Sequence, residues 1–193
     1  MRAWRTCAFL AGAAFLLAGC AEVARPYVPA RIGAIHDTVS SGAIEVSIDT
    51  DDRQALIGQP IMFRVTIRNT SQQALWVPRD PDLLFTWIYP DGRRDNFLRE
   101  FADERFYHEG EAVLLKPGFQ MTKFVQIKTY YFERSGITEF RALLHAGRNT
   151  NPALNPFWYG EAMSNGYGVL VLDSKKKGFL SGALSSAARV PAS

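Results

Sequence analysis

Apolar and polar residues alternate along residues 61–69, IMFRVTIRN, with Met62 as the one exception, and this pattern constrains the fold more than any other feature of the chain. Every second residue is large and apolar, namely Ile61, Phe63, Val65 and Ile67. Successive side chains of a β-strand point to opposite faces, so this period of two predicts a strand with one buried face. The same pattern recurs in residues 43–49, AIEVSID.

Further apolar runs of strand length follow, and turn signals separate them. They occupy residues 74–78, 83–89, 112–118, 120–131, 137–146 and 167–173. Pro90-Asp91-Gly92 and Pro117-Gly118 are typical of tight turns, because Pro presets φ and Gly accepts a positive φ. Seven or eight strands joined in this way predict an all-β fold: an antiparallel sandwich of the immunoglobulin-like or fibronectin-III-like type.

Residues 96–108, NFLREFADERFYH, are the one stretch with helical character. Phe97, Phe101 and Arg105 fall four residues apart, which is the spacing of one helix face. The sequence therefore predicts either a short crossover helix near residues 96–106 or an irregular loop.

The first nineteen residues have the pattern of a secretory signal. Arg2 and Arg5 precede an apolar stretch, residues 6–18, that is too short to span a bilayer as a helix. The next residues, Leu17-Ala18-Gly19-Cys20, resemble the lipobox of bacterial lipoproteins. This resemblance implies removal of residues 1–19 and lipidation of Cys20, and Ala21 after it favours the outer membrane. The alternative is an ordinary signal peptide with an incidental cysteine.

Lipidation would leave the mature chain without a free thiol, because Cys7 lies in the removed segment. Removal of Arg2 and Arg5 with this segment would take two of the 22 basic residues and leave the chain nearly neutral against its 19 acidic residues. Proteins that bind nucleic acids are usually strongly basic, so we expect no nucleic-acid partner. Residues 20–42, with their prolines, are interpreted as an extended tether, residues 43–173 as the sandwich and residues 174–193 as a disordered tail.

Several short motifs resemble a recurrent immunoglobulin-like module of secreted bacterial proteins. The resemblance covers residues 43–173 and implies a sandwich with a noncatalytic tendency. The matching positions are Gly58, Pro60, Asn69, Ser71, Pro117, Gly118, Gly136, Phe140, Trp158, Gly160, Ser164 and Asn165.

Patterns for catalysis and metal binding are weak. Asp49, Asp51 and Asp52 are candidate calcium ligands, but the glycine and the acid that an EF-hand loop needs are missing. A zinc-protease helix would need a second histidine four residues after His108, where the chain has Ala112. We therefore expect no resident metal, no cofactor, no catalytic residues and no enzyme activity.

The best candidate for binding is the aromatic run Phe157-Trp158-Tyr159. It ends a long connection that contains two Asn-Pro steps, between the last two predicted strands. Loops at a sandwich end often carry binding, and aromatic rings there can stack on sugars or fill a partner's pocket. Trp158 matches the module, so it is expected in the core, whereas Phe157 and Tyr159 are the better binding residues.

These observations favour a lipid-anchored protein of the bacterial cell envelope, attached to the outer membrane and facing the periplasm or the cell surface. Its domain is expected to bind an unidentified envelope protein or glycan as an accessory or recognition module. Two alternatives stay open: a module similar to proteinase inhibitors of the intracellular type, and a hydrolase acting on the cell wall or on peptides.

Overall fold

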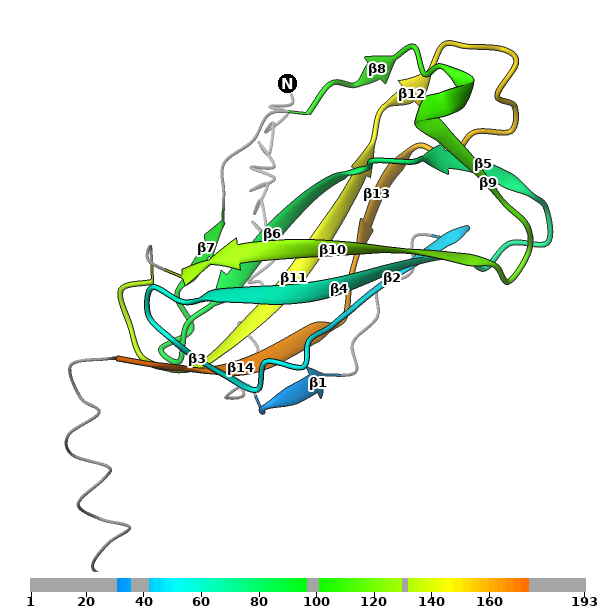
Figure 1. The fold of residues 1–193 in the computed structure, drawn as a ribbon. Helices are drawn as coiled ribbons and strands as arrows, with labels where there is room; N and C mark the ends of the chain where they lie inside the picture. Colours follow the sequence, from blue (N-terminus) through cyan, green and yellow to red (C-terminus); the bar gives the residue numbers. More distant parts are fainter. Residues whose placement is uncertain (1–30, 36–41, 97–100, 130–131, 174–193) are drawn as a thin grey trace, which may run out of the picture.

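A computed structural model of the chain describes residues 31–35, 42–96, 101–129 and 132–173 (Figure 1). Strands form nearly all of the regular structure, and η1 (Glu109–Glu111) is a single 3-10 turn. The predicted signal segment at 1–19, Cys20 and the predicted tail at 174–193 lie outside the described residues.

The first sheet consists of β2 (Ile44–Asp49), β4 (Pro60–Asn69) and β10 (Gln120–Lys128), all antiparallel in the order β10-β4-β2. The predicted alternation is confirmed in β4. Ile61, Phe63, Val65 and Ile67 are at most 1% exposed, while Met62 between them is 44% exposed. The apolar face of this sheet is therefore one half of the core.

The second sheet is built around β11 (Gly136–Ala146), which pairs with β6 (Asp82–Ile88) on one side and with β14 (Gly166–Leu172) on the other. β7 (Arg94–Asn96) extends it beyond β6, and β13 (Gly160–Met163) continues the β14 side along β11. The strand predicted for residues 83–89 is confirmed as β6, which has a partner strand on both sides.

The strand order defines an immunoglobulin-like sandwich. The sheet β10-β4-β2 corresponds to strands E, B and A of that fold, and β6, β11 and β14 correspond to C, F and G. A short strand, β3 (Gln54–Leu56), crosses to the second sheet and pairs in parallel with β14. In Figure 1 the first sheet lies across the second.

Phe63 of β4 joins the two sheets at the centre of the core. Its ring lies 5.3 Å from that of Phe85, 5.0 Å from that of Phe140 and 6.3 Å from that of Tyr167, all on the opposing sheet. Tilted and edge-on ring pairs at such distances add to the stability that apolar burial provides. Phe63, Phe85 and Phe140 are at most 2% exposed, so this cluster excludes water from the space between the sheets.

Both predicted turns are confirmed. Gly92 has a φ of +83°, and the Arg93 amide donates to Asp91 Oδ1 over 3.1 Å. Gly118 has a φ of +76°, and the Phe119 amide donates to the Lys116 carbonyl over 3.0 Å. A positive φ costs glycine little and other residues more, so the two glycines fix these turns.

Of the two alternatives for residues 96–106, the short helix is wrong where the structure describes this stretch. Asn96 ends β7, and β8 (Glu104–Arg105) pairs in parallel with β12 (Arg148–Asn149). The spacing of four residues rested on three side chains only. It was outweighed by backbone bonds to a distant segment, among them the Arg148 amide to the Asp103 carbonyl at 2.7 Å.

The second sheet begins before residue 43. Within the expected tether, β1 (Gly33–Ile35) pairs antiparallel with β14, from Gly33 opposite Gly168 to Ile35 opposite Gly166. The remaining short strands, β5 (Leu75–Pro78) and β9 (Ala112–Leu115), pair with each other. Figure 1 shows β5, β8, β9 and β12 gathered at one end of the molecule, where the predicted binding loop also lies.

Candidate functional site

Residues 150–159, here called the aromatic loop, connect β12 to β13. The structure separates the roles of its three predicted aromatic residues. Trp158 is 7% exposed and belongs to the main core, as expected for the residue that matches the module. Phe157 is partly buried, and its ring stacks on that of Tyr107 with centroids 4.7 Å apart. Tyr159 is 58% exposed and is therefore the aromatic residue that a ligand can reach.

A small second core supports the aromatic loop. Tyr107, Ala112 and Leu154 are at most 3% exposed there, and Trp76 and Phe157 pack against them. The loop backbone is also bonded to β5 on both sides of Phe157. The Trp76 amide donates to the Pro156 carbonyl, and the Trp158 amide donates to the Trp76 carbonyl, both at 2.9 Å. These contacts fix the segment that leads into Tyr159.

Two asparagines shape the first half of the aromatic loop. The Asn149 amide group donates to the carbonyls of Asn151 and Leu154, and its oxygen accepts the Asn151 amide at 3.0 Å. Asn151 in turn donates to the Tyr107 carbonyl at 2.7 Å and accepts the Ala153 amide at 3.0 Å. The side-chain amides thus form hydrogen bonds with backbone groups that would otherwise lack a partner in a loop of this length. This role was not predicted from the sequence, although Asn at such spacing is a known turn signal.

A groove of about 360 Å³ lies along the aromatic loop, and Arg148, Asn155 and Tyr159 are exposed on it. The Arg148 guanidinium lies over the Tyr159 ring, 5.6 Å from its centroid. The concave shape and the volume are in the range of small-ligand sites. The groove thus combines one exposed aromatic ring, one cation and neutral amide groups.

In the neighbouring segment, the pKa values of Tyr107 and Glu111 are shifted from their ordinary values. Burial raises the pKa of the Tyr107 hydroxyl, so this side chain stays neutral in the second core. The backbone hydrogen bond from His108, together with Arg105, lowers the pKa of Glu111. Glu111 is therefore ionised at neutral pH, where it accepts the His108 amide at 2.9 Å and pairs with Arg105 at 3.1 Å.

The weak calcium candidates do not come together. The Arg64 guanidinium donates to both carboxylate oxygens of Asp49. This hydrogen bonding raises the pKa of Arg64 above its ordinary value. Asp52 accepts the Met62 amide at 3.1 Å, and Asp51 is exposed. Among the described residues no group of three or more His, Cys, Asp or Glu side chains is placed to hold a metal ion.

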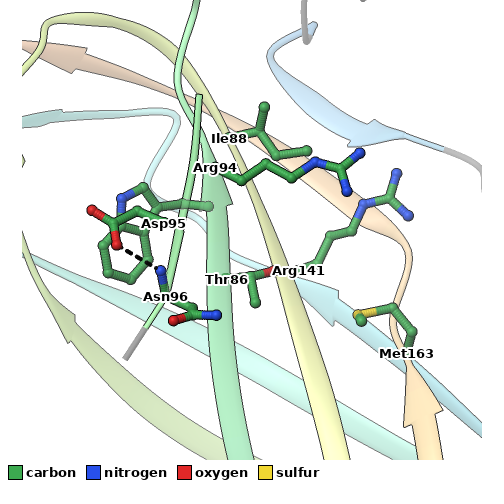
Figure 2. Close-up of a pocket in the computed structure, with 8 residues that line it drawn as sticks. Thr86, Ile88, Arg94, Asp95, Asn96, Arg141 and Met163 are labelled. Carbon is green, nitrogen blue, oxygen red and sulfur yellow. Dashed lines mark hydrogen bonds between the residues drawn. The ribbon is translucent and has the colours of Figure 1, made fainter. Parts of the chain in front are cut away.

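A larger groove of about 540 Å³, which Figure 2 shows, was not predicted from the sequence. It lies on the outer face of the second sheet, and Arg94 and Arg141 line it. The alternation of residues 137–146 places Arg141 on the polar face, but only the pairing of β11 with β6, and of β6 with β7, brings it near Arg94.

Leu17, Ala18, Gly19 and Cys20, which resemble a lipobox, lie outside the described residues. In the part of the chain that the structure describes, no helix has the length and apolar character needed to cross a membrane.

No protein-family model matches this chain, and no curated protein matches it. Solved structures with similar chain traces include the CARDB domain of a Pyrococcus furiosus protein, crystallised with di-metal ions. It is 11% identical, with 67% of this chain and 87% of that chain covered and a TM-score of 0.35. A β-glucosidase from Listeria innocua is 15% identical over 66% of this chain and 16% of that chain, with a TM-score of 0.34. These values assign no family, and the fold class rests on the strand order described above.

Fold and site together define the class of protein: an immunoglobulin-like β-sandwich whose end carries a braced loop with an exposed aromatic residue.

Proposed function

We propose that this chain is a bacterial lipoprotein whose immunoglobulin-like domain binds an envelope glycan and performs no catalysis. The anchor in this proposal is Cys20, the acceptor residue of the sequence Leu17-Ala18-Gly19-Cys20. Acyl chains contribute about 0.8 kcal/mol per buried CH₂, so two or three of them hold a protein firmly on a membrane. The membrane in question is the outer membrane, which Ala21 favours.

The exposed ring of Tyr159 is the observation that carries the binding part of the proposal. Binding of a ligand would remove the apolar surface of this exposed ring from water, which is favourable. Tyr also offers a large contact area and has few rotamers that binding must immobilise. The bonds of Trp76, Asn149 and Asn151 hold the aromatic loop in shape before a ligand arrives. Such preorganisation lowers the entropy that binding has to overcome.

A glycan fits the groove better than a flat protein surface does, because the groove is concave and neutral amides line much of its rim. A sugar ring can stack on Tyr159 while its hydroxyls bond to Arg148 and to the side-chain amide of Asn155. Both Arg148 and Asn155 are exposed and line the groove beside Tyr159.

The test uses the full chain, solubilised in mild detergent from bacterial membranes, with purified peptidoglycan sacculi and immobilised lipopolysaccharide as the two glycan probes. Tyr159→Ala is expected to weaken binding about tenfold, which corresponds to 1.4 kcal/mol. The matched control is Phe124→Ala, because Phe124 is also an aromatic ring, 69% exposed, on β10 far along the chain from the aromatic loop. It is expected to bind as the unmodified chain does.

Other results would replace the proposal. If neither glycan binds and crosslinking in cells yields one reproducible envelope protein, the domain is a protein-binding accessory subunit. Inhibition of a protease in a panel would assign it to the inhibitor class. Turnover of sacculi or peptides that depends on added Zn²⁺ or Ca²⁺ would make it an enzyme.

A further inference from the structure

Arg94 and Arg141 reach one groove from two strands that are not adjacent. Arg94 lies on β7 opposite Ile88 of β6, and Arg141 lies on β11 opposite Thr86 of β6. Strand β6 therefore runs between them, and both side chains stand on its outer face. In Figure 2 the two guanidinium groups extend in the same direction, toward one side of the groove.

The two arginines differ in what holds them. The Arg141 Nε donates to Glu139 Oε1 over 2.7 Å, and the Glu139 side chain is only 8% exposed. A buried carboxylate thus sets the direction of the Arg141 guanidinium, whose terminal nitrogens bond to no described residue. Arg94 is exposed, and no described carboxylate lies within ion-pair distance of it. Apart from the Arg141–Glu139 bond, the N–H donors of the two side chains bond to no described carboxylate, and they match the oxygens of a carboxylate or phosphate.

The rest of the groove is not cationic. Ile88 and Met163 supply apolar surface, and Thr86 and Asn96 add polar groups that can accept or donate hydrogen bonds. Asp95 lies between Arg94 and Asn96 on β7 and opposite Trp87, so its side chain stands on the other face of the sheet. Because Glu139 offsets the charge of Arg141, a bare anion gains little here. A ligand that joins an oxyanion to a hydroxylated body satisfies both parts of the groove.

We propose that the groove between Arg94 and Arg141 binds an acidic sugar, with its carboxylate or phosphate held by the two guanidinium groups and its hydroxyls by Asn96 and Thr86. This site is separate from the aromatic loop, and none of its residues belongs to the loop. It adds a second binding surface to the domain, on the outer face of the β6-β11 sheet.

The experiment measures dissociation constants for the detergent-solubilised full chain by calorimetry. The probes are glucuronate, galacturonate and glucose 6-phosphate, with glucose and inorganic phosphate as the two incomplete ligands. At least one acidic sugar is expected to bind at least tenfold more tightly than glucose and than inorganic phosphate. A preference for the uronates or for the phosphosugar then identifies the oxyanion.

Arg94→Gln is expected to weaken that binding at least tenfold. The matched control is Arg68→Gln, which removes the same charge from an exposed position on β4 of the other sheet and is expected to change affinity less than twofold. Arg141→Lys tests the second arginine while keeping a cation beside Glu139, and a threefold or larger loss is expected.

Three results would overturn the proposal. They are the absence of binding for all three acidic sugars, equal binding of inorganic phosphate, and equal losses in Arg94→Gln and Arg68→Gln. The last would show attraction by net charge only. Because Tyr159 takes no part in this groove, failure here leaves the glycan proposal for the aromatic loop untouched, and Tyr159→Ala is expected to leave acidic-sugar binding unchanged.

Discussion

The side chain of Asn165 forms a two-point bridge to the backbone of Ile48 across the two sheets. The Ile48 amide donates to Asn165 Oδ1 over 2.8 Å, and Asn165 Nδ2 donates to the Ile48 carbonyl over 3.3 Å. Asn165 lies between β13 and β14 and is 6% exposed, whereas Ile48 belongs to β2 of the other sheet. One carboxamide thus takes the place of a neighbouring strand for a buried part of β2.

Asn165→Ala is expected to destabilise the domain, because it leaves a buried amide and a buried carbonyl without partners. An unsatisfied buried group costs about 1–3 kcal/mol, so we expect a loss of about 2–4 kcal/mol in the free energy of unfolding, measured by urea denaturation. Asn155→Ala is the matched control, because Asn155 is exposed in the aromatic loop and is expected to change the value by less than about 0.5 kcal/mol. Equal stability of Asn165→Ala and the unmodified chain would show that the bridge is not formed.

Gly168 marks the place where β1 lies against β14. A Cβ at this position would lie 1.8 Å from the Arg31 carbonyl oxygen, which is far below any allowed contact. Gly168→Ala is therefore expected to displace β1 while the sandwich stays folded. The measurement is amide hydrogen exchange of residues 33–35, which should speed up at least tenfold. Gly110→Ala adds the same methyl group where nothing lies within 4 Å and should leave the exchange unchanged, so equal protection in both variants would contradict the docking of β1.

The strands could be predicted from the sequence because their signal is local. Alternation in residues 61–69 needs no knowledge of a partner, and Pro-Gly or Asp-Gly steps indicate turns by themselves. The four-residue spacing in 96–108 is an equally local signal, but there the pairing of β8 with β12 determined the structure. Propensity gives way where tertiary pairing satisfies the backbone better.

The candidate sites could be predicted only in part, because they depend on which strands meet. The exposed Tyr159 lies in the loop that the sequence indicated, and Trp158 is in the core as expected. The stacking of Phe157 on Tyr107 could not be predicted from the sequence, and neither could the groove that Arg94 and Arg141 share. Both juxtapositions follow from the register of strands far apart in the chain.

Phe157 and Tyr159 are expected to separate stability from binding. Phe157→Ala removes the ring that stacks on Tyr107 and should lower the free energy of unfolding by about 2 kcal/mol. Tyr159→Ala, at an exposed position, should change it by less than about 0.5 kcal/mol. Urea denaturation of both variants provides the measurement. Comparable destabilisation by the two substitutions would mean that Tyr159 packs rather than binds.

Glu111 is expected to make the free energy of unfolding of the domain depend on pH in the acidic range. Its pKa in the folded chain lies below the ordinary value of 4.5, mainly because the His108 amide donates to it. A carboxyl group with a lowered pKa stabilises the fold fully when the pH is above its pKa in the unfolded chain. This stabilisation disappears as the pH falls through its pKa in the folded chain. The unmodified chain should therefore be more stable than Glu111→Gln at pH 7, and the difference should narrow below about pH 4.5.

Urea midpoints at pH 7, 5, 4 and 3 measure this difference. Glu109→Gln is the control, because the Glu109 side chain makes no hydrogen bond to a described residue. It should follow the unmodified chain at every pH. A constant gap between the unmodified chain and Glu111→Gln down to pH 3 would contradict the assigned hydrogen bond.

Cys20 is expected to carry the lipid that holds the protein on the membrane. In cells that process lipoproteins, the mature chain should begin at Cys20, gain the mass of its acyl groups and partition into the detergent phase of Triton X-114. Cys20→Ser removes the sulfur that accepts the diacylglyceryl group, so it should show no lipid mass and should leave the detergent phase. Cys7→Ser provides the matched control, since Cys7 lies within residues 1–19 and is expected to be removed with them. Mass spectrometry of the intact mature chain distinguishes the outcomes, and membrane retention of Cys20→Ser equal to that of Cys7→Ser would show that another feature anchors the protein.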